Sequence, residues 1–172
     1  QVLEDGARGR VVPESSIIVE SLDRHHGGAM LPAETDAQLE ARLWDRLYDS
    51  YVQHPMQRAV GARLGGDPAA WDAVSAQSRA ELATAYDLIE RTMEGRAWGA
   101  GDQFTIADCA AAPGLFYAAA VLPFARSHPR LAAYFKRLAA RPTVARVFAE
   151  AGPYMHFFPL REALEPRFRH DP

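Results

Sequence analysis

Cysteine is nearly absent from this chain of 172 residues, which contains a single one, Cys109. One cysteine excludes an intrachain disulfide and a metal site built from several thiolates. This scarcity suits a reducing compartment, so we expect a cytoplasmic protein. Adjacent His25 and His26 point in different directions on a helix, and the other histidines show no ligand spacing. We therefore expect no metal site.

Basic clusters and long apolar runs are lacking as well. The formal net charge is -3, and the basic residues are scattered among acidic ones, which leaves no electrostatic footprint for nucleic acid. The longest apolar run, residues 109–125, is shorter than a membrane span and is interrupted by Pro113 and Pro123. We expect neither a nucleic-acid partner nor a membrane, and we interpret this run as a buried helix.

The first segment has the pattern of a hairpin followed by a helix. Short apolar runs at residues 2–3 and 11–12 flank the turn-forming sequence EDGARGR, and a helical pattern runs from Glu14 to the glycine pair at 27–28. A two-stranded hairpin is marginal by itself in water. Since the sequence also does not begin with Met, we expect the first part of this domain to precede Gln1.

The rest of the chain has helical periodicity. Residues 34–53 carry a wide apolar stripe, which we expect to be buried, and Pro55 should bend or end that helix. The next helix should begin with Asp67 as its cap, and two later helices are each introduced by a proline, Pro129 and Pro142. The members of the stripe are Leu39, Leu43, Trp44, Leu47, Tyr48, Tyr51 and Val52.

A capping box is the clearest local signal in the chain. In the stretch FTIADCAA, Thr105 can cap the first amides of a helix, while Asp108 reaches back to the amide of Thr105. A buried helix gains more from this arrangement than an exposed one, because its free amides have no water to bind. Losing such a cap typically costs about 1 kcal/mol.

The helix start PESSII lacks a capping box and could bind a ligand. Ser15 or Ser16 could cap the helix, but Ile18 and Val19 stand where a reciprocal acidic partner would be, so the first amides stay partly available for an anion. Glu14 would attract an ammonium group. The segment could therefore bind both ends of an amino-acid-like zwitterion. The alternative is that these are ordinary residues of a first helical turn.

The chain has a hairpin that closes on PESSIIVESL and a helical remainder, with FTIADCAAAP about ninety residues after the helix start and ARPTVARV near the end. The order of these features resembles the cytosolic glutathione S-transferase superfamily of bacterial type. The resemblance implies a mainly α fold. Residues 1–27 would be the hairpin and last helix of a thioredoxin-like domain, and residues 28–172 the all-helical domain. It also implies that Glu14 and Ser15 bind the γ-glutamyl end of glutathione.

The activity implied by the resemblance is the transfer of the glutathione thiolate to an electrophilic, mostly apolar molecule, as in detoxification. Glutathione would be the co-substrate. The catalytic Ser, Tyr or Cys of the family would precede Gln1, because no residue of this chain can be assigned that role, and Cys109 is expected to be a buried structural thiol. The alternative is a binding or assembly module without catalytic activity.

The resemblance also implies a homodimer, with the apolar stripe near residues 44–52 in the interface. We expect Asp45 and Asp49 on the same helix to face solvent, although an acid there could reach the partner's glutathione. The candidate aromatic residues for the second-substrate pocket are Tyr51, Tyr117, Phe157 and Phe158.

Overall fold

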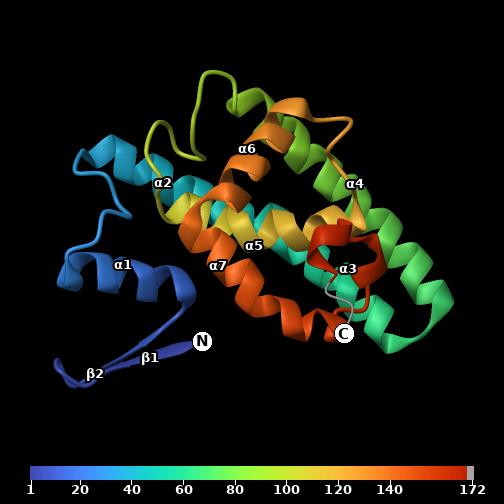
Figure 1. Cartoon of the computed structure of the whole chain (residues 1–172), viewed down its shortest axis with the longest axis horizontal. Helices are drawn as coiled ribbons and strands as arrows, with labels where there is room; N and C mark the ends of the chain where they lie inside the picture. The colour runs from blue at the N-terminus through green and yellow to red at the C-terminus, as the bar shows by residue number, and fades with distance from the viewer. Residues whose placement is uncertain (170–172) are drawn as a thin grey trace.

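The computed structural model of the chain describes residues 1–169. At its N-terminal end, strands β1 (Val2–Asp5) and β2 (Arg10–Pro13) form an antiparallel hairpin that pairs over four residues. Helix α1 (Ser15–His26) packs on the hairpin, and together they lie at one end of the molecule (Figure 1). The predicted hairpin and helix are therefore confirmed.

The remainder of the described chain is helical, and α5 runs through its middle (Figure 1). In chain order the elements are α2 (Thr35–Leu47), a π-helical turn (Tyr48–Gln53), α3 (His54–Gly65), α4 (Pro68–Thr92), α5 (Ile106–Val121), α6 (Pro129–Ala140), α7 (Pro142–Ala151) and 3-10 turns over Gly152–Phe157, Arg161–Ala163 and Pro166–Phe168. The mainly helical fold is confirmed. The last three residues of the predicted second domain lie outside the described residues.

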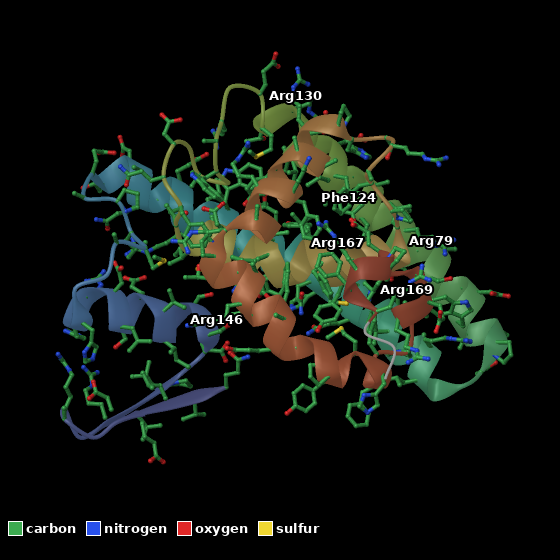
Figure 2. All side chains as sticks on the ribbon, viewed as in Figure 1. Arg79, Phe124, Arg130, Arg146, Arg167 and Arg169 are labelled. Atoms are coloured by element: carbon green, nitrogen blue, oxygen red, sulfur yellow. The ribbon has the colours of Figure 1, made fainter. Side chains whose placement is uncertain are left out.

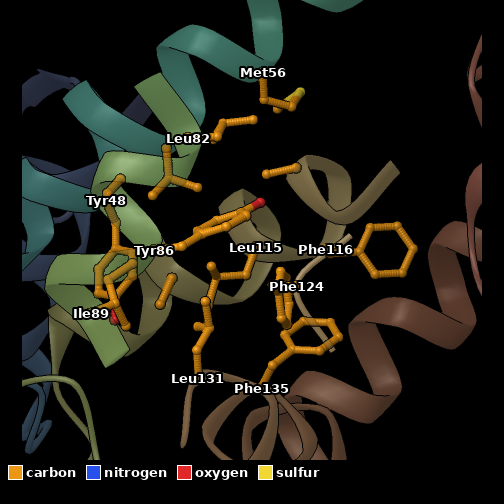
Figure 3. Packing of buried hydrophobic residues seen from close by; sticks show 14 of the residues in the cluster. Tyr48, Met56, Leu82, Tyr86, Ile89, Leu115, Phe116, Phe124, Leu131 and Phe135 are labelled. Carbon is orange, nitrogen blue, oxygen red and sulfur yellow. The ribbon is translucent and has the colours of Figure 1, made fainter. Parts of the chain in front are cut away.

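The hydrophobic core forms where the π-helical turn, α4, α5 and α6 meet. Tyr48, Tyr86, Leu115 and Leu131 are almost completely buried there (Figure 3). The Tyr86 ring packs edge-on against Phe124, with 5.2 Å between the ring centroids. Burying one large apolar side chain contributes about 1.5–3 kcal/mol, so these contacts hold the helices together.

The predicted apolar stripe of residues 34–53 is only partly buried, so the expectation of one wide buried face was wrong. Trp44 and Tyr48 are buried, whereas Leu39, Leu43 and Tyr51 are 59%, 52% and 60% exposed. The helices that cover this segment pack on the side that carries Trp44 and Tyr48. Beyond Leu47 the π-helical turn also changes the number of residues per turn, so the side chains drift off the 3.6-residue pattern.

Helix α3 is an element that the sequence pattern did not predict. It starts at His54, directly after the π-helical turn, and Pro55 lies in its first turn. A proline is tolerated there because the first amides of a helix have no intrahelical acceptor. The helical path therefore continues past Pro55 as a new helix, which ends at Gly65 and is followed by Gly66 in the left-handed conformation.

The start of α5 contains the capping box formed by Thr105 and Asp108. Asp108 is fully buried, and its carboxylate accepts hydrogen bonds from the amides of Thr105 and Gly99, each at 2.8 Å. It also accepts a hydrogen bond of 2.6 Å from the hydroxyl of Tyr134 on α6. One carboxylate thus joins α5, the loop before it and α6.

The linker between α1 and α2 is tied to both of its neighbours. Asp23 of α1 accepts the amides of Met30 and Leu31 at 2.5 and 3.3 Å, and the Met30 carbonyl accepts the Ile106 amide of α5 at 3.0 Å. A Cβ at Gly28 would lie 2.9 Å from the backbone Cα of Asp23, so the linker has no room for a side chain there. These contacts fix α1 relative to α5.

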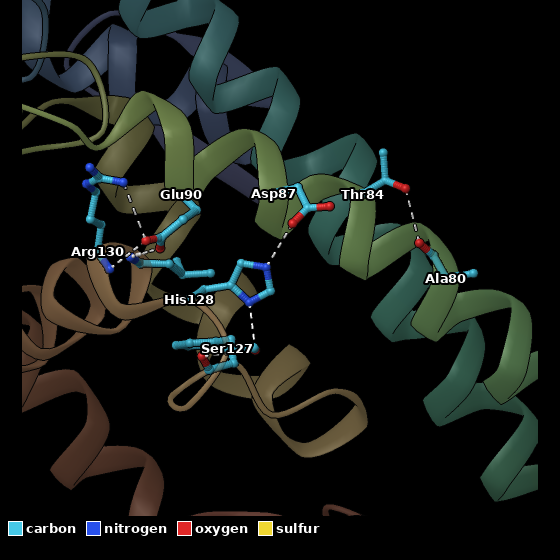
Figure 4. A network of polar contacts seen from close by, with 9 residues as sticks. Ala80, Thr84, Asp87, Glu90, Ser127, His128 and Arg130 are labelled. Carbon is cyan, nitrogen blue, oxygen red and sulfur yellow. Dashed lines mark hydrogen bonds and ion pairs between the residues drawn. The ribbon is translucent and has the colours of Figure 1, made fainter.

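Side chains of α4 organise the start of α6 (Figure 4). Glu90 accepts the amides of Arg130 and Leu131 at 3.1 and 2.9 Å, which satisfies donors that α6 leaves free at its first turn. The ring nitrogens of His128 lie 3.2 Å from Asp87 Oδ1 and 2.8 Å from Ser127 Oγ. These polar contacts therefore add to the hydrophobic packing between α4 and α6.

The arginines are spread over separate elements (Figure 2). Arg79 on α4 donates to the Val121 carbonyl at 2.9 Å, Arg130 on α6 pairs with Glu94 at 3.1 Å, and Arg146 on α7 lies 3.6 Å from Glu150. These side chains make local contacts with neighbouring carbonyl and carboxylate groups.

We predict that Asp108→Ala lowers the free energy of unfolding by about 3 kcal/mol or more, because it leaves several buried donors unpaired at once. Urea unfolding measures this loss. The control is Asp67→Ala, which removes an exposed cap that accepts the Ala69 amide at 3.0 Å and should cost about 1 kcal/mol. Equal losses in the two variants would contradict a special role for the buried carboxylate.

Candidate functional site

A cavity of about 400 Å³ opens where the start of α1 meets α2, the π-helical turn and α5. These elements lie next to one another at the hairpin end of the bundle (Figure 1). Glu14, Ser15 and Ser16 line the cavity from α1, and Asp45 lines it from α2. The two residues predicted to bind a zwitterion, Glu14 and Ser15, therefore both line this cavity.

Glu14 holds an uncommon backbone conformation at the start of α1. Its φ angle is 69° and its ψ angle is 122°, a positive-φ conformation that costs a residue with a Cβ about 1–3 kcal/mol. Glu14 occupies the N-cap position and its carbonyl accepts the Ile18 amide at 2.8 Å, yet no side chain caps the helix. The first turn of α1 therefore keeps amides that can bind an anion.

Asp45 is the residue of the cavity whose environment the sequence analysis misjudged. It is 5% exposed, which corrects the expectation of a solvated helix face. Its carboxylate accepts the Ser16 hydroxyl at 3.0 Å. Burial raises the pKa of Asp45, the Ser16 hydrogen bond and Arg46 oppose that rise, and Asp49 adds to it. Periodicity could not show this burial, because α1 supplies the cover.

The charges around the cavity are mostly negative. Glu14, Asp45 and Asp49 line it, and the one guanidinium among the lining residues, Arg46, pairs with Asp49 at 3.0 Å. Carboxylates favour an ammonium group nearby, while the free amides of α1 favour a carboxylate. The arrangement can therefore bind a small molecule that carries both groups.

The opposite wall of the cavity is a face of α5 with little polar surface. Ile106, Ala110 and Pro113 line it at intervals of three and four residues, and Tyr117 follows one turn later on the same face. Pro113 has no amide hydrogen, so it cannot donate to the Cys109 carbonyl as a normal helical residue would. The wall thus offers apolar area and one backbone acceptor.

The four aromatic residues predicted for a second-substrate pocket do not form one cluster. The rings of Tyr117 and Phe158 pack against each other with 4.9 Å between their centroids and an angle of 59° between their planes. Phe157 is 72% exposed, and Tyr51 lines a different groove. The structure therefore unites Tyr117 with Phe158 and separates the other two from them.

That second groove lies between α4 and the segment formed by α2 and the π-helical turn, and has a volume of about 610 Å³. Its lining is mostly apolar and includes Tyr51 and Leu88, which are 60% and 39% exposed, while Glu81 and Arg91 contribute charges. Sequence reasoning missed it, because a groove between two helices depends on how they pack.

Cys109 lines the same cavity as Glu14 and Ser15. Burial is the main cause that raises the pKa of its thiol, to about 11, and the neighbouring Asp108 adds to the rise. Its sulfur lies 3.9 Å from the sulfur of Met30 in the linker. The thiolate is the nucleophilic form of cysteine, so this raised pKa makes Cys109 unsuited to nucleophilic chemistry.

Within residues 1–169, no group of three or more His, Cys, Asp or Glu side chains is arranged to hold a metal ion. The helices of this same range also fall short of the length and apolar character that crossing a membrane requires.

We predict that Cys109 reacts with iodoacetamide roughly a hundredfold more slowly than free glutathione at pH 8, because its raised pKa leaves little thiolate. The rate should keep rising with pH up to about 11. Mass spectrometry of the folded chain measures the rate, and the urea-unfolded chain is the control. A plateau near pH 8.5 in the folded chain would contradict the raised pKa.

Comparison with protein families and curated proteins gives concordant matches. Residues 53–142 match the family model described as the glutathione S-transferase, C-terminal domain. The glutathione S-transferase-like protein LUC7 of a Fusarium species is 30% identical over 117 residues, which is 66% of this chain and 52% of that protein. The chain thus spans about half the length of this curated relative.

Solved structures extend the similarity to most of the chain. BphK, a bacterial glutathione S-transferase solved as a ternary complex, gives a TM-score of 0.73 at 23% identity and covers 88% of this chain and 73% of its own. A glutathione S-transferase of Methylobacterium radiotolerans, solved in complex with glutathione sulfonate, gives a TM-score of 0.66 at 31% identity. It covers 84% of this chain and 69% of its own. A third glutathione S-transferase, from Rhodospirillum rubrum, gives a TM-score of 0.71 at 22% identity and covers 83% of this chain and 67% of its own.

Proposed function

This chain belongs to the glutathione S-transferase superfamily, and from that premise we propose that the cavity at the start of α1 binds glutathione. The γ-glutamyl carboxylate lies against Ser15 and the free amides of the first turn, and the ammonium group lies near Glu14. The observation that carries the proposal is the uncapped start of α1, held by the strained Glu14 at the edge of an acidic cavity.

The proposed reaction is the transfer of the glutathione thiolate to an apolar electrophile. Its support is the α5 face of Ile106, Ala110 and Pro113, which leads from the cavity to the Tyr117 and Phe158 pair and could contact an apolar second substrate. No described residue is assigned to activating the thiol. Cys109 is unsuited, because burial raises its pKa to about 11.

The second candidate is a module that binds glutathione without catalysis. The raised pKa of Cys109 favours this candidate, because it makes that thiol a poor nucleophile. Three buried tyrosines favour it as well, since burial raises the pKa of each phenol and disfavours the phenolate; they are Tyr48, Tyr86 and Tyr134. A turnover assay with glutathione and a chloronitrobenzene separates the candidates, because the module binds glutathione without forming the conjugate.

We predict that Ser15→Ala weakens glutathione binding about tenfold, because it removes a hydrogen bond to a charged group. Isothermal titration calorimetry measures the affinity. Ser127→Ala, which changes an exposed serine next to α6, is the matched control and should bind like the wild type. If the wild type binds glutathione and Ser15→Ala binds it equally well, Ser15 does not contact the ligand.

The proposed assembly is a homodimer through the groove between α2 and α4. Tyr51 and Leu88 line this groove and are exposed, and Leu43 is exposed on α2 beside it. An apolar surface of this kind marks an interaction site when it is contiguous. A twofold axis would place the same surface on both copies, which is the commonest arrangement of homo-oligomers.

We predict that Leu88→Glu converts the dimer to a monomer, because the carboxylate would be desolvated in an apolar interface. Sedimentation velocity at several protein concentrations measures the assembly. Val147→Glu, at a position on α7 that is 55% exposed, is the control and should leave the dimer intact. A wild-type chain that sediments as a monomer at all concentrations would refute the dimer.

A further inference from the structure

Three side chains within residues 1–169 carry a buried polar atom without a hydrogen-bond partner, namely Tyr48 Oη, Gln53 Oε1 and Ser78 Oγ. Such atoms are rare in folded proteins, and each calls for an explanation. Tyr48 lines the groove between α2 and α4, and Ser78 is fully buried on α4. Gln53 instead lines the cavity at the start of α1. Its carboxamide oxygen is therefore an acceptor that a ligand of this cavity can use.

Gln53 lies at the end of the cavity away from α1. It is the last residue of the π-helical turn and follows Asp45 by about two helical turns, so it lies roughly 10 Å further along the helical path than the contact between Ser16 and Asp45. A Cβ on Gly114 would lie 3.7 Å from Gln53 Oε1, which places this oxygen against α5 next to Pro113. The cavity therefore extends from the start of α1 to Gln53 and Pro113.

The described residues supply no donor for this oxygen. Pro113, the residue of α5 that lines this end of the cavity, has no amide hydrogen to offer. The guanidinium of Arg46 also lines the cavity but is held by Asp49 at 3.0 Å. An acceptor that is buried without a donor destabilises the fold, because it has lost its hydrogen bonds to water. The donor for Gln53 therefore has to come from a bound molecule.

We infer that Gln53 is a specificity-determining residue, whose Oε1 accepts a hydrogen bond from a hydroxyl or N–H group on the second substrate. This inference rests on the proposed function and names the substrate class, an apolar electrophile that carries a hydrogen-bond donor. With the γ-glutamyl end of glutathione at Glu14 and Ser15, the group joined to the sulfur lies toward Gln53 and the apolar face of α5. The terminal torsion of a glutamine is soft, so the oxygen turns toward the ligand without breaking a hydrogen bond of its own.

Two conjugates that differ by one hydroxyl test the inference, S-hexylglutathione and S-(6-hydroxyhexyl)glutathione. The wild type should bind the hydroxylated conjugate about fivefold more tightly, because its hydroxyl supplies the donor that Gln53 lacks. Gln53→Leu offers no acceptor, so it should lose this preference and still bind S-hexylglutathione like the wild type. Isothermal titration calorimetry gives the four affinities, and their double difference isolates the contact between Gln53 and the hydroxyl.

Ser78→Ala is the matched control, because it also removes a buried oxygen without a partner but lies on α4, outside the lining of the cavity. It should keep the preference of the wild type for the hydroxylated conjugate. Thermal melts by circular dichroism verify folding, and neither variant should melt below the wild type, since each loses an unpaired polar atom. Gln53→Met replaces Gln53→Leu if the latter is not folded.

Three results would overturn the inference and leave the proposed function in place. The wild type binds the two conjugates equally well, or the preference survives in Gln53→Leu. In the third, Gln53→Leu weakens the binding of glutathione itself, which would show that Gln53 contacts the tripeptide and not the second substrate. A wild type that binds neither glutathione nor its conjugates would refute both the inference and the proposed function.

Discussion

The carboxylate of Asp108 is the contact on which the arrangement of the molecule depends. A carboxylate buried away from water is tolerated only when donors surround it, and here the donors come from the start of α5, from the loop before it and from α6. Satisfying this one group therefore fixes three segments at once. Helix α5, which starts at the carboxylate, supplies both the centre of the core and one wall of the cavity.

The same helix start also sets the position of the N-terminal segment. The Ile106 amide donates to Met30, whose own amide is held by Asp23 of α1. The contact between Ser16 and Asp45 adds a second tie between α1 and the bundle. The cavity exists because α1 is held against α2 and α5 by these few polar contacts, so its shape responds to changes at any of them.

The chemistry of the cavity follows from how its two sides differ. One side combines free helix amides with carboxylates, which suits a zwitterion, and the other presents an apolar face of α5. Glutathione has the required zwitterionic end, and its sulfur can be joined to an apolar group. Burial raises the pKa of the cavity thiol, which makes Cys109 a poor nucleophile, so the described residues support the proposed binding of glutathione and leave the activation of its sulfur unassigned.

The sequence by itself determined the features that depend on neighbours three or four residues apart: the capping box at Thr105, the helices introduced by Pro129 and Pro142, and the helix start at Glu14 and Ser15. Tertiary structure alone decided the burial of Asp45, the exposure of Leu39, Leu43 and Tyr51, and the existence of α3 beyond Pro55. The physical reason is that a helix pattern shows which residues share a face but not which face another helix covers. That choice is made by packing between segments far apart in the chain.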